Sequence, residues 1–276
     1  MFKTKALAMT AILVPFLLFA ADLKTSTYSS DDFKRVELET FNGSISATVT
    51  DDEDITIKYS IGTGVLPEEM DNALGALTKL ASELGGIDDL NVEVQKDKEA
   101  GILKIKVDQD ENESITGCNV EISVPEDIYL KLSTDNGWIT VDGLKKGFDI
   151  SSINGYLDIK NTSGNARFEA TNGYVKIDHK GNITGNATNG YVSGKVVMAD
   201  HNGACKISSV NNNIDIEVPS TVGARVSLST VHGTTAISGF DVETKEIDGD
   251  IVRTIGDGSG TIDLSTVNGD VELREL

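Results

Sequence analysis

The sequence has few of the residues that fill a bulky core. Its 276 residues include one Trp, six Tyr, eight Phe and four Pro. The chain is rich instead in Gly, Asn, Ser and Thr, a composition that is typical of many short strands joined by tight turns. The length is sufficient for a large core. We therefore predict an all-β protein.

Cysteine is too scarce for a disulfide scaffold. Cys118 and Cys205 are the only two cysteines. In an exported protein they could form one disulfide, or they could remain two buried thiols, and the sequence leaves both alternatives open.

Basic residues are also in short supply. The chain has 24 Lys and Arg against 44 Asp and Glu, which gives a formal net charge of -20. A charge this negative keeps a protein soluble and repels nucleic acids and anionic lipid surfaces. It argues against DNA, RNA or lipid headgroups as ligands.

Only one long hydrophobic run is present, at the N-terminus. Lys3 and Lys5 precede an apolar run over 6–20, which predicts a signal peptide over 1–21 and an exported protein of the periplasm or cell surface. The run is short for a membrane span, although an uncleaved anchor stays an alternative. Removing it takes away two Lys and no acid, so the charge moves from -20 to -22. No later segment of the mature chain predicts a membrane span.

Asn-Gly pairs recur through the second half of the chain. They begin at Asn136, Asn154, Asn172, Asn189, Asn202 and Asn268. The first intervals are 18, 18, 17 and 13 residues, and His232-Gly233 lies 36 residues before the last pair. Asn and Gly tolerate positive φ, so each pair allows a sharp corner.

Alternating apolar residues follow each pair, as Ile139 and Val141 do after Asn136, and this alternation predicts a half-buried strand. Asn-Gly between strands usually marks an antiparallel hairpin. A constant interval favours the other arrangement, a β-helix-like solenoid of about 18-residue coils stacked in register.

Stacking in register predicts two columns of outward side chains. The first is aromatic and comprises Trp138, Tyr156, Tyr174 and Tyr191. The second alternates in charge and comprises Asp142, Lys160, Asp178 and Lys195. Rings in the first column would lie about 4.8 Å apart, and opposite charges in neighbouring strands would stabilise the pairing.

The N-terminal part has a different pattern. Strands are predicted over 36–49 and 55–60, and again after residue 90. Between them, 66–84 has helical spacing, with Pro67 in the first turn and Gly85 after the last. We expect a β-rich capping section over 22–125, in which this helix covers one end of a solenoid formed by 126–276.

The order of these motifs resembles the putative-adhesin family of β-strand-repeat domains, found in bacterial and archaeal envelope proteins. The resemblance is clearest from residue 118 onward and rests on Val124-Pro125, on Asp135 to Val141, on the Asn-Gly strands, on Val218-Pro219, and on Gly258 to Val271. It implies a right-handed β-helix-like fold and an envelope location. It implies no catalytic residue.

Catalytic and metal-binding motifs are absent from the sequence. The histidines at 179, 201 and 232 lack metal-ligand spacing and sit in or beside predicted turns. Gly256 to Gly260 precedes a strand, which makes it a turn and not a phosphate loop. We predict no enzyme, no cofactor and no metal site.

The aromatic column is the candidate binding site, because ring faces can stack on sugars or anchor a protein. The structural alternative is that the rings only shield one another. As function we predict an adhesin or polymer-binding module of the envelope. The alternatives are an envelope component that docks a membrane or signalling protein and, more remotely, a polysaccharide-active β-helix enzyme.

Overall fold

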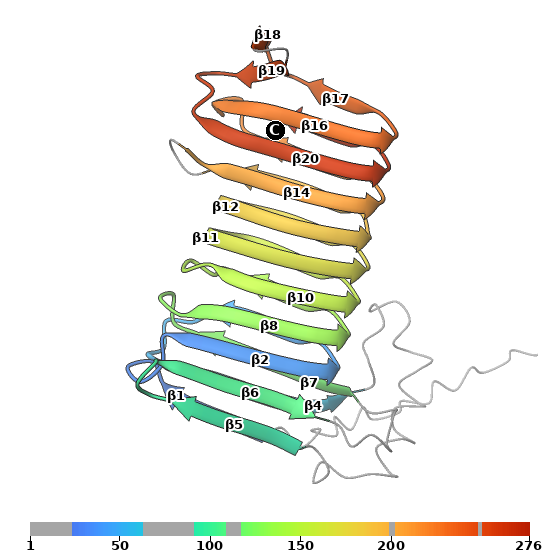
Figure 1. The fold of residues 1–276 in the computed structure, drawn as a ribbon. Helices are drawn as coiled ribbons and strands as arrows, with labels where there is room; N and C mark the ends of the chain where they lie inside the picture. Colours follow the sequence, from blue (N-terminus) through green and yellow to red (C-terminus); the bar gives the residue numbers. More distant parts are fainter. Residues whose placement is uncertain (1–23, 63–90, 109–116, 199–201, 248–249) are drawn as a thin grey trace, which may run out of the picture.

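The protein is an all-β stack of strands, as Figure 1 shows for the computed structural model. The structure describes residues 24–62, 91–108, 117–198, 202–247 and 250–276. These residues form one open sheet of 21 strands and contain no helix, and so no helix that could span a membrane. The all-β class is confirmed.

One ladder of parallel strands runs the length of the stack, in front in Figure 1. In stacking order it contains β6 (Ile102–Asp108), β2 (Arg35–Asn42), β8 (Tyr129–Asn136), β10 (Phe148–Asn154), β11 (Leu157–Asn172), β12 (Val175–Asn189), β14 (Ala204–Asn211), β20 (Gly260–Asn268) and β16 (Ala224–His232).

A second parallel ladder receives the chain after each corner. It contains β7 (Gly117–Val124), β3 (Ile45–Val49), β9 (Ile139–Asp142), the first parts of β11 and β12, β13 (Val192–Val197), β15 (Ile214–Val218), β21 (Val271–Glu275) and β17 (Thr235–Ser238). The apolar side chains of both ladders form one core.

The Asn-Gly pairs are corners between parallel strands and not hairpin turns. Asn136 pairs with Asn154, and Asn154 with Asn172, each 18 residues further along. Every second residue points inward, so Ile139, Leu157 and Val175 lie above one another and are fully buried. Equal spacing in the sequence has become a column in space.

Sequence order and stacking order differ near both ends. The β2–β3 coil lies between the β6–β7 and β8–β9 coils, and the β20–β21 coil lies between β14–β15 and β16–β17. His232 therefore pairs directly with Asn268. Their 36-residue interval spans one step of the stack and not two coils, because the chain leaves the stack between them.

Antiparallel strands lie at the two ends. They are β1 (Lys24–Ser29), β4 (Asp54–Gly62) and β5 (Asn91–Asp97) at one end, and β18 (Val242–Ile247) and β19 (Asp250–Ile255) at the other. Such strands cover the hydrogen-bonding edge of a terminal coil. The helix predicted over 66–84 and the signal peptide predicted over 1–21 lie outside the described residues.

One corner assigned from the sequence was wrong, and another was missed. Asn202 lies outside the corner column, and the residue paired with Asn189 is Asn211, which is followed by Asn and not by Gly. Asn42-Gly43, which the search for the repeat did not include, is a corner paired with Asn136. The 13-residue interval was thus no coil, and the stack reaches into the N-terminal third.

The two cysteines are free and buried. Cys118 lies in β7 and Cys205 in β14, at different levels of the stack. Burial raises the pKa of the Cys118 thiol to about 11 and that of Cys205 to about 12. Of the two alternatives left open by the sequence, the structure contains the buried thiols and not the disulfide.

His179 is buried, although the sequence placed it among exposed turn residues. Its Nε2 lies 3.2 Å from the carbonyl oxygens of Gly164 and Asn182, and its Nδ1 lies 2.9 Å from the Thr162 hydroxyl. Carbonyls only accept, so Nε2 carries the proton. In the neutral ring Nδ1 can then accept the Thr162 hydroxyl proton, for which the Asp178 carbonyl at 3.3 Å competes. Burial is the largest influence on its pKa and lowers it below the usual value.

We predict that this histidine makes the protein sensitive to mild acid. The unfolded chain takes up the proton near pH 6.5, above the folded pKa, so the stabilisation is complete above that pH and is lost as pH falls. The slope of unfolding free energy should approach about 1.4 kcal/mol per pH unit. Urea denaturation between neutral and mildly acidic pH measures it. His179→Gln should flatten the slope and exposed His232→Gln should not; equal slopes in both variants would contradict the assignment.

Candidate binding surface

An asparagine ladder runs along the corners of the stack. Each side-chain amide donates from Nδ2 to the Oδ1 of its neighbour, at 2.8–2.9 Å. In stacking order the members are Asn42, Asn136, Asn154, Asn172, Asn189, Asn211 and Asn268. The ladder joins coils that are far apart in the sequence. Its exposed members are Asn154, Asn172, Asn189, Asn211 and Asn268.

We predict a moderate loss of stability when the ladder is interrupted. Asn172→Ala removes the bond to Asn154 and the bond from Asn189. Two net hydrogen bonds correspond to about 1–2 kcal/mol of unfolding free energy. Chemical denaturation measures the loss, with the neighbouring exposed Thr171→Ala as control, which should stay within about 0.5 kcal/mol of the native protein. Equal values for the two variants would show that the ladder contributes nothing.

The predicted aromatic column lies beside the ladder. The ring centroids of Trp138 and Tyr156 are 4.8 Å apart, and so are those of Tyr156 and Tyr174. The two tyrosine rings are parallel within 2°, whereas the indole is inclined by 54°. Tyr191 instead donates from its hydroxyl to Asp215 Oδ2 at 3.2 Å.

This geometry decides which ring faces are accessible. Parallel rings lying side by side in one plane would need centroids roughly 6–7 Å apart, so rings at 4.8 Å must overlap face to face. One face of Tyr156 is therefore covered by Tyr174, and the inclined Trp138 ring lies next to Tyr156 at the preceding level. Tyr174 has one stacked face and is 51% exposed, and Trp138 is turned out of the parallel stack. The overlap of Tyr156 and Tyr174 agrees with the structural alternative, and a binding role for the column stays a prediction.

The predicted charge column is only partly formed. Asp142 pairs with Lys160, and Asp178 with Lys195. The register shifts after Ile159, and the Lys160 ammonium lies 2.8 Å from Asp158 on its own strand. That contact is the largest influence raising the pKa of Lys160. The register shift is a β-bulge that the spacing of the sequence does not reveal, and next to it Lys160 contacts Asp158.

A second apolar column was missed by the sequence analysis. It lies on the other side of the ladder, one residue before each corner asparagine, and its exposed aliphatic and aromatic members are Phe41, Ile153, Val210, Val267 and Val231. Thr171 and Thr188 continue it through the middle of the stack. The signal was available as the residue before each corner, but it needed the corrected corners to be seen.

We call the two columns, the ladder and the corner glycines together the corner strip. Nine large hydrophobic side chains are exposed in the described part of the chain, and seven lie on this strip. Two carboxylates continue the columns: Asp135 lies directly before the corner Asn136, and Asp270 lies two residues after the corner Asn268. By contrast, the outward column five residues before the corners is mostly charged: Glu37, Lys131, Asp149, Arg167, Thr184, Lys206, Asp263 and Ser227. A continuous charge-poor strip is unusual on a chain this acidic, and such surfaces mark interaction sites.

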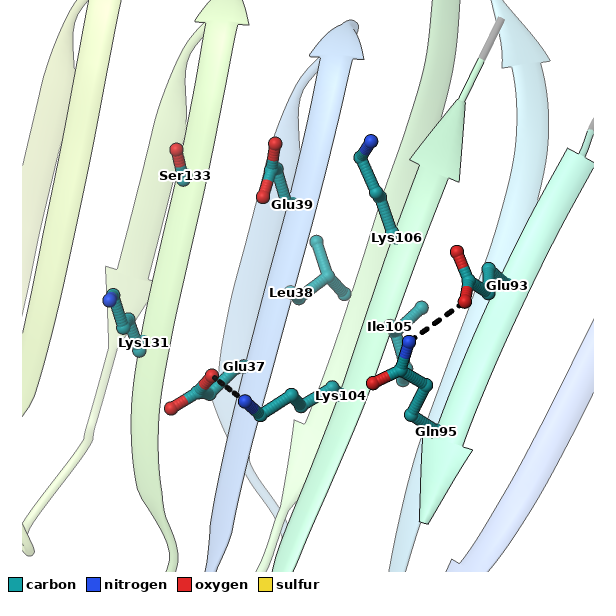
Figure 2. Close-up of a pocket in the computed structure, with 10 residues that line it drawn as sticks. All are labelled: Glu37, Leu38, Glu39, Glu93, Gln95, Lys104, Ile105, Lys106, Lys131 and Ser133. Atoms are coloured by element: carbon teal, nitrogen blue, oxygen red, sulfur yellow. Dashed lines mark hydrogen bonds and ion pairs between the residues drawn. The ribbon is translucent and has the colours of Figure 1, made fainter. Parts of the chain in front are cut away.

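A shallow groove of about 200 Å³ lies over β5, β6, β2 and β8, at the β5 end of the stack (Figure 2). Leu38 and Ile105 line its floor. Above them, the Lys104 ammonium lies 3.6 Å from the Glu37 carboxylate, and Gln95 donates to Glu93 at 2.8 Å. Lys104 and Glu37 contact each other between neighbouring strands, whereas Gln95 and Glu93 contact each other along β5, and the side chains do not converge on one point. In the described residues, no group of three or more His, Cys, Asp or Glu is placed to hold a metal ion.

Comparison with known proteins gives general similarity only. No family model and no curated protein matches the sequence. Among solved structures, a putative cell adhesion protein from Clostridium sporogenes is 11% identical, with a TM-score of 0.35, over 92% of this chain and 99% of that one. A putative adhesin from Bacteroides fragilis is 13% identical, with a TM-score of 0.38, over 92% and 97%. Another from Parabacteroides distasonis is 13% identical, with a TM-score of 0.30, over 93% and 98%. No residue role is transferred from them.

Proposed function

We propose that the protein is an exported, non-catalytic adhesin-type module that binds an uncharged extracellular polysaccharide along the corner strip. The observation that carries the proposal is the concentration of exposed apolar side chains on both sides of a hydrogen-bonding amide ladder. In this proposal the stack of strands is a right-handed β-solenoid, which presents the same side-chain types at each level.

The aromatic residues of the strip suit a sugar ligand. Sugar rings stack on aromatic faces, and the accessible faces are those of Trp138 and Tyr174. Between these rings and the aliphatic column, the ladder amides can donate to and accept from sugar hydroxyls. An extended polymer could contact several levels at once, so that weak contacts add through multivalency.

The charge distribution indicates which polysaccharides are suitable. The net charge of -20 opposes anionic polymers. The near absence of charge on the strip itself favours a neutral chain, whose binding would depend little on salt. This reasoning selects neutral glucans or similar polymers over acidic ones.

We expect the fluorescence of Trp138, the only Trp, to change saturably when a soluble neutral glucan is added. Replacing Tyr156, Tyr174 and Tyr191 by Ser should raise the dissociation constant for the glucan by about tenfold or more, because each ring contact contributes about 1 kcal/mol to binding. An acidic polysaccharide of similar length should give no saturable change. Circular dichroism would show that the variant is folded.

The absence of a response to every neutral polymer tested, from a folded native protein, would contradict the proposal. The alternative function, docking of a membrane or signalling protein of the envelope, would then become the leading one. Protease accessibility in intact cells separates the two: the polymer-binding module should be cleaved from outside, and an internal envelope component should be protected until the envelope is opened.

A further inference from the structure

The chain contains seven Asn-Gly pairs, and each is a potential site of spontaneous chemical modification. They begin at Asn42, Asn136, Asn154, Asn172, Asn189, Asn202 and Asn268. In a flexible chain, the backbone nitrogen after Asn attacks the side-chain carbonyl carbon, and Gly hinders this attack least because it has no side chain. A protein exposed outside the cell would accumulate such damage, so the surroundings of each pair are informative.

Both reacting groups are held at the ladder corners except at Asn189-Gly190, where no hydrogen bond from the Gly190 N–H is found among the described residues. The backbone N–H of the corner glycine donates to the carbonyl of the next level, as Gly137 does to Asn154 at 2.9 Å and Gly155 to Asn172 at 2.9 Å. Gly43, Gly173 and Gly269 make the same bond, at 2.8–3.2 Å. The side-chain amide is held separately by its ladder neighbours. Attack would require breaking the N–H bond and turning the amide out of the ladder.

In the described part of the chain, Asn202-Gly203 shows neither hydrogen-bond restraint, although Gly203 itself is buried. It lies outside the corner column, Asn202 is exposed, and its φ is +66°. Among the described residues, no hydrogen bond holds the Asn202 side chain or the Gly203 N–H. The Gly203 carbonyl alone accepts a bond, from Thr261 N at 2.9 Å.

We propose that Asn202 is the deamidation and isoaspartate site of the folded protein, and that the ladder and the glycine N–H bonds together protect the corner pairs that begin at Asn42, Asn136, Asn154, Asn172 and Asn268 from the same reaction. The Gly203 nitrogen loses its proton to base and forms a bond to Asn202 Cγ. The Cγ–Nδ2 bond breaks, and the nitrogen leaves as ammonia with a proton from solvent, so a succinimide remains. Water then opens either carbonyl to give aspartate or isoaspartate, with no change in oxidation state. The product adds one negative charge near the β14 end of the stack.

The test compares deamidation rates of each pair in the folded and unfolded full-length protein. The protein is incubated in mildly alkaline buffer with and without denaturing urea, and the proteolytic peptides are followed by mass spectrometry. In urea, all seven pairs should react at similar rates. In the folded protein, Asn202 should keep its unfolded rate to within about threefold, whereas Asn136, Asn154 and Asn268 should react about tenfold more slowly or less, because hydrogen bonds must open first.

Asn172→Ala supplies an internal control, because it removes the ladder partner of Asn154 and leaves Asn268 untouched. The rate at Asn154 should rise by about threefold or more while that at Asn268 stays constant. Asn202→Gln should abolish the rapid reaction without unfolding the protein. Folded-state rates at the ladder equal to those in urea, or an Asn202 as slow as the ladder, would overturn the proposal.

Discussion

Replacing Gly173 by Ala is expected to lower the free energy of unfolding by about 4 kcal/mol or more. A methyl group there would lie 1.6 Å from the carbonyl oxygen of Gly155, and the residue has φ +145°, a region that L residues rarely adopt. The carbonyl belongs to the backbone of the next level, which is fixed by the parallel ladder on both sides. It cannot move without breaking the register, so the clash and the strain add.

Gly143→Ala is the matched control. Gly143 also has positive φ, at +77°, but an added methyl would only make ordinary contacts with Val49, at 3.7–3.9 Å. This variant should lose roughly 1–2 kcal/mol, the cost of the left-handed conformation alone. Urea denaturation of both proteins gives the difference, which isolates the close approach of the levels. Similar losses in the two variants would contradict a close-packed corner.

The second large effect is expected in the core, at Gly185. Its partner in the next level is Phe168, which is fully buried, and an added methyl would lie 1.9 Å from the Phe168 Cζ. Gly185 does not have a positive φ, so the effect of an added methyl group on stability depends on packing alone. The Phe168 ring occupies the space that the missing side chain leaves. Gly185→Ala should therefore destabilise the protein by about 3 kcal/mol through overpacking.

A double-mutant cycle tests this pairing. Phe168→Leu alone should cost about 1–2 kcal/mol because it leaves a cavity. Combined with Gly185→Ala, the new methyl partly fills that cavity, so the double variant should be more stable than the sum of the single effects by about 1–3 kcal/mol. Strict additivity in denaturation experiments would mean that the two residues are not stacked as the parallel register requires.

The architecture was largely predictable from the sequence because the repeat contains its own geometry. Equal intervals after Asn136, Asn154 and Asn172 fix which residues can lie above one another, and alternation fixes which of them point inward. The aromatic column followed from those two facts alone. Hairpins were a real alternative, and only the constancy of the interval argued against them.

Other features depend on contacts that spacing does not encode. The β2–β3 coil is separated by a long stretch of sequence from the β8–β9 coil on which it stacks, so Asn42 could not be found by extending the 18-residue period. Asn202 has the Asn-Gly sequence of a corner but does not form one, because the next corner after Asn189 is Asn211, 22 residues further along the chain. The Asn-Gly motif was misleading at this position, and the strand pairing of Asn189 with Asn211 identified the true corner.

Of the two columns in the candidate site, only the aromatic one was predicted from the sequence. The aromatic column is visible as Tyr after Asn-Gly, but the second apolar column is visible only once Asn42 and Asn211 are recognised as corners in addition to His232. Ring accessibility was also beyond the sequence, since it depends on the 2° and 54° angles between neighbouring rings. In the proposed site, the expected sugar contacts therefore move to Trp138 and Tyr174, and the ladder and the second apolar column are added.

The most direct test of the corner strip places one charge inside it and one outside it. Thr188 and Thr184 are both exposed on β12, the first within the strip and the second in the charged column of the same strand. We expect Thr188→Glu to weaken binding of a neutral glucan, measured by Trp138 fluorescence or calorimetry, by about tenfold, because a buried unpaired charge must be desolvated. Thr184→Glu should bind within about twofold of the native protein. Equal affinities for the two variants would contradict the assignment of binding to the corner strip.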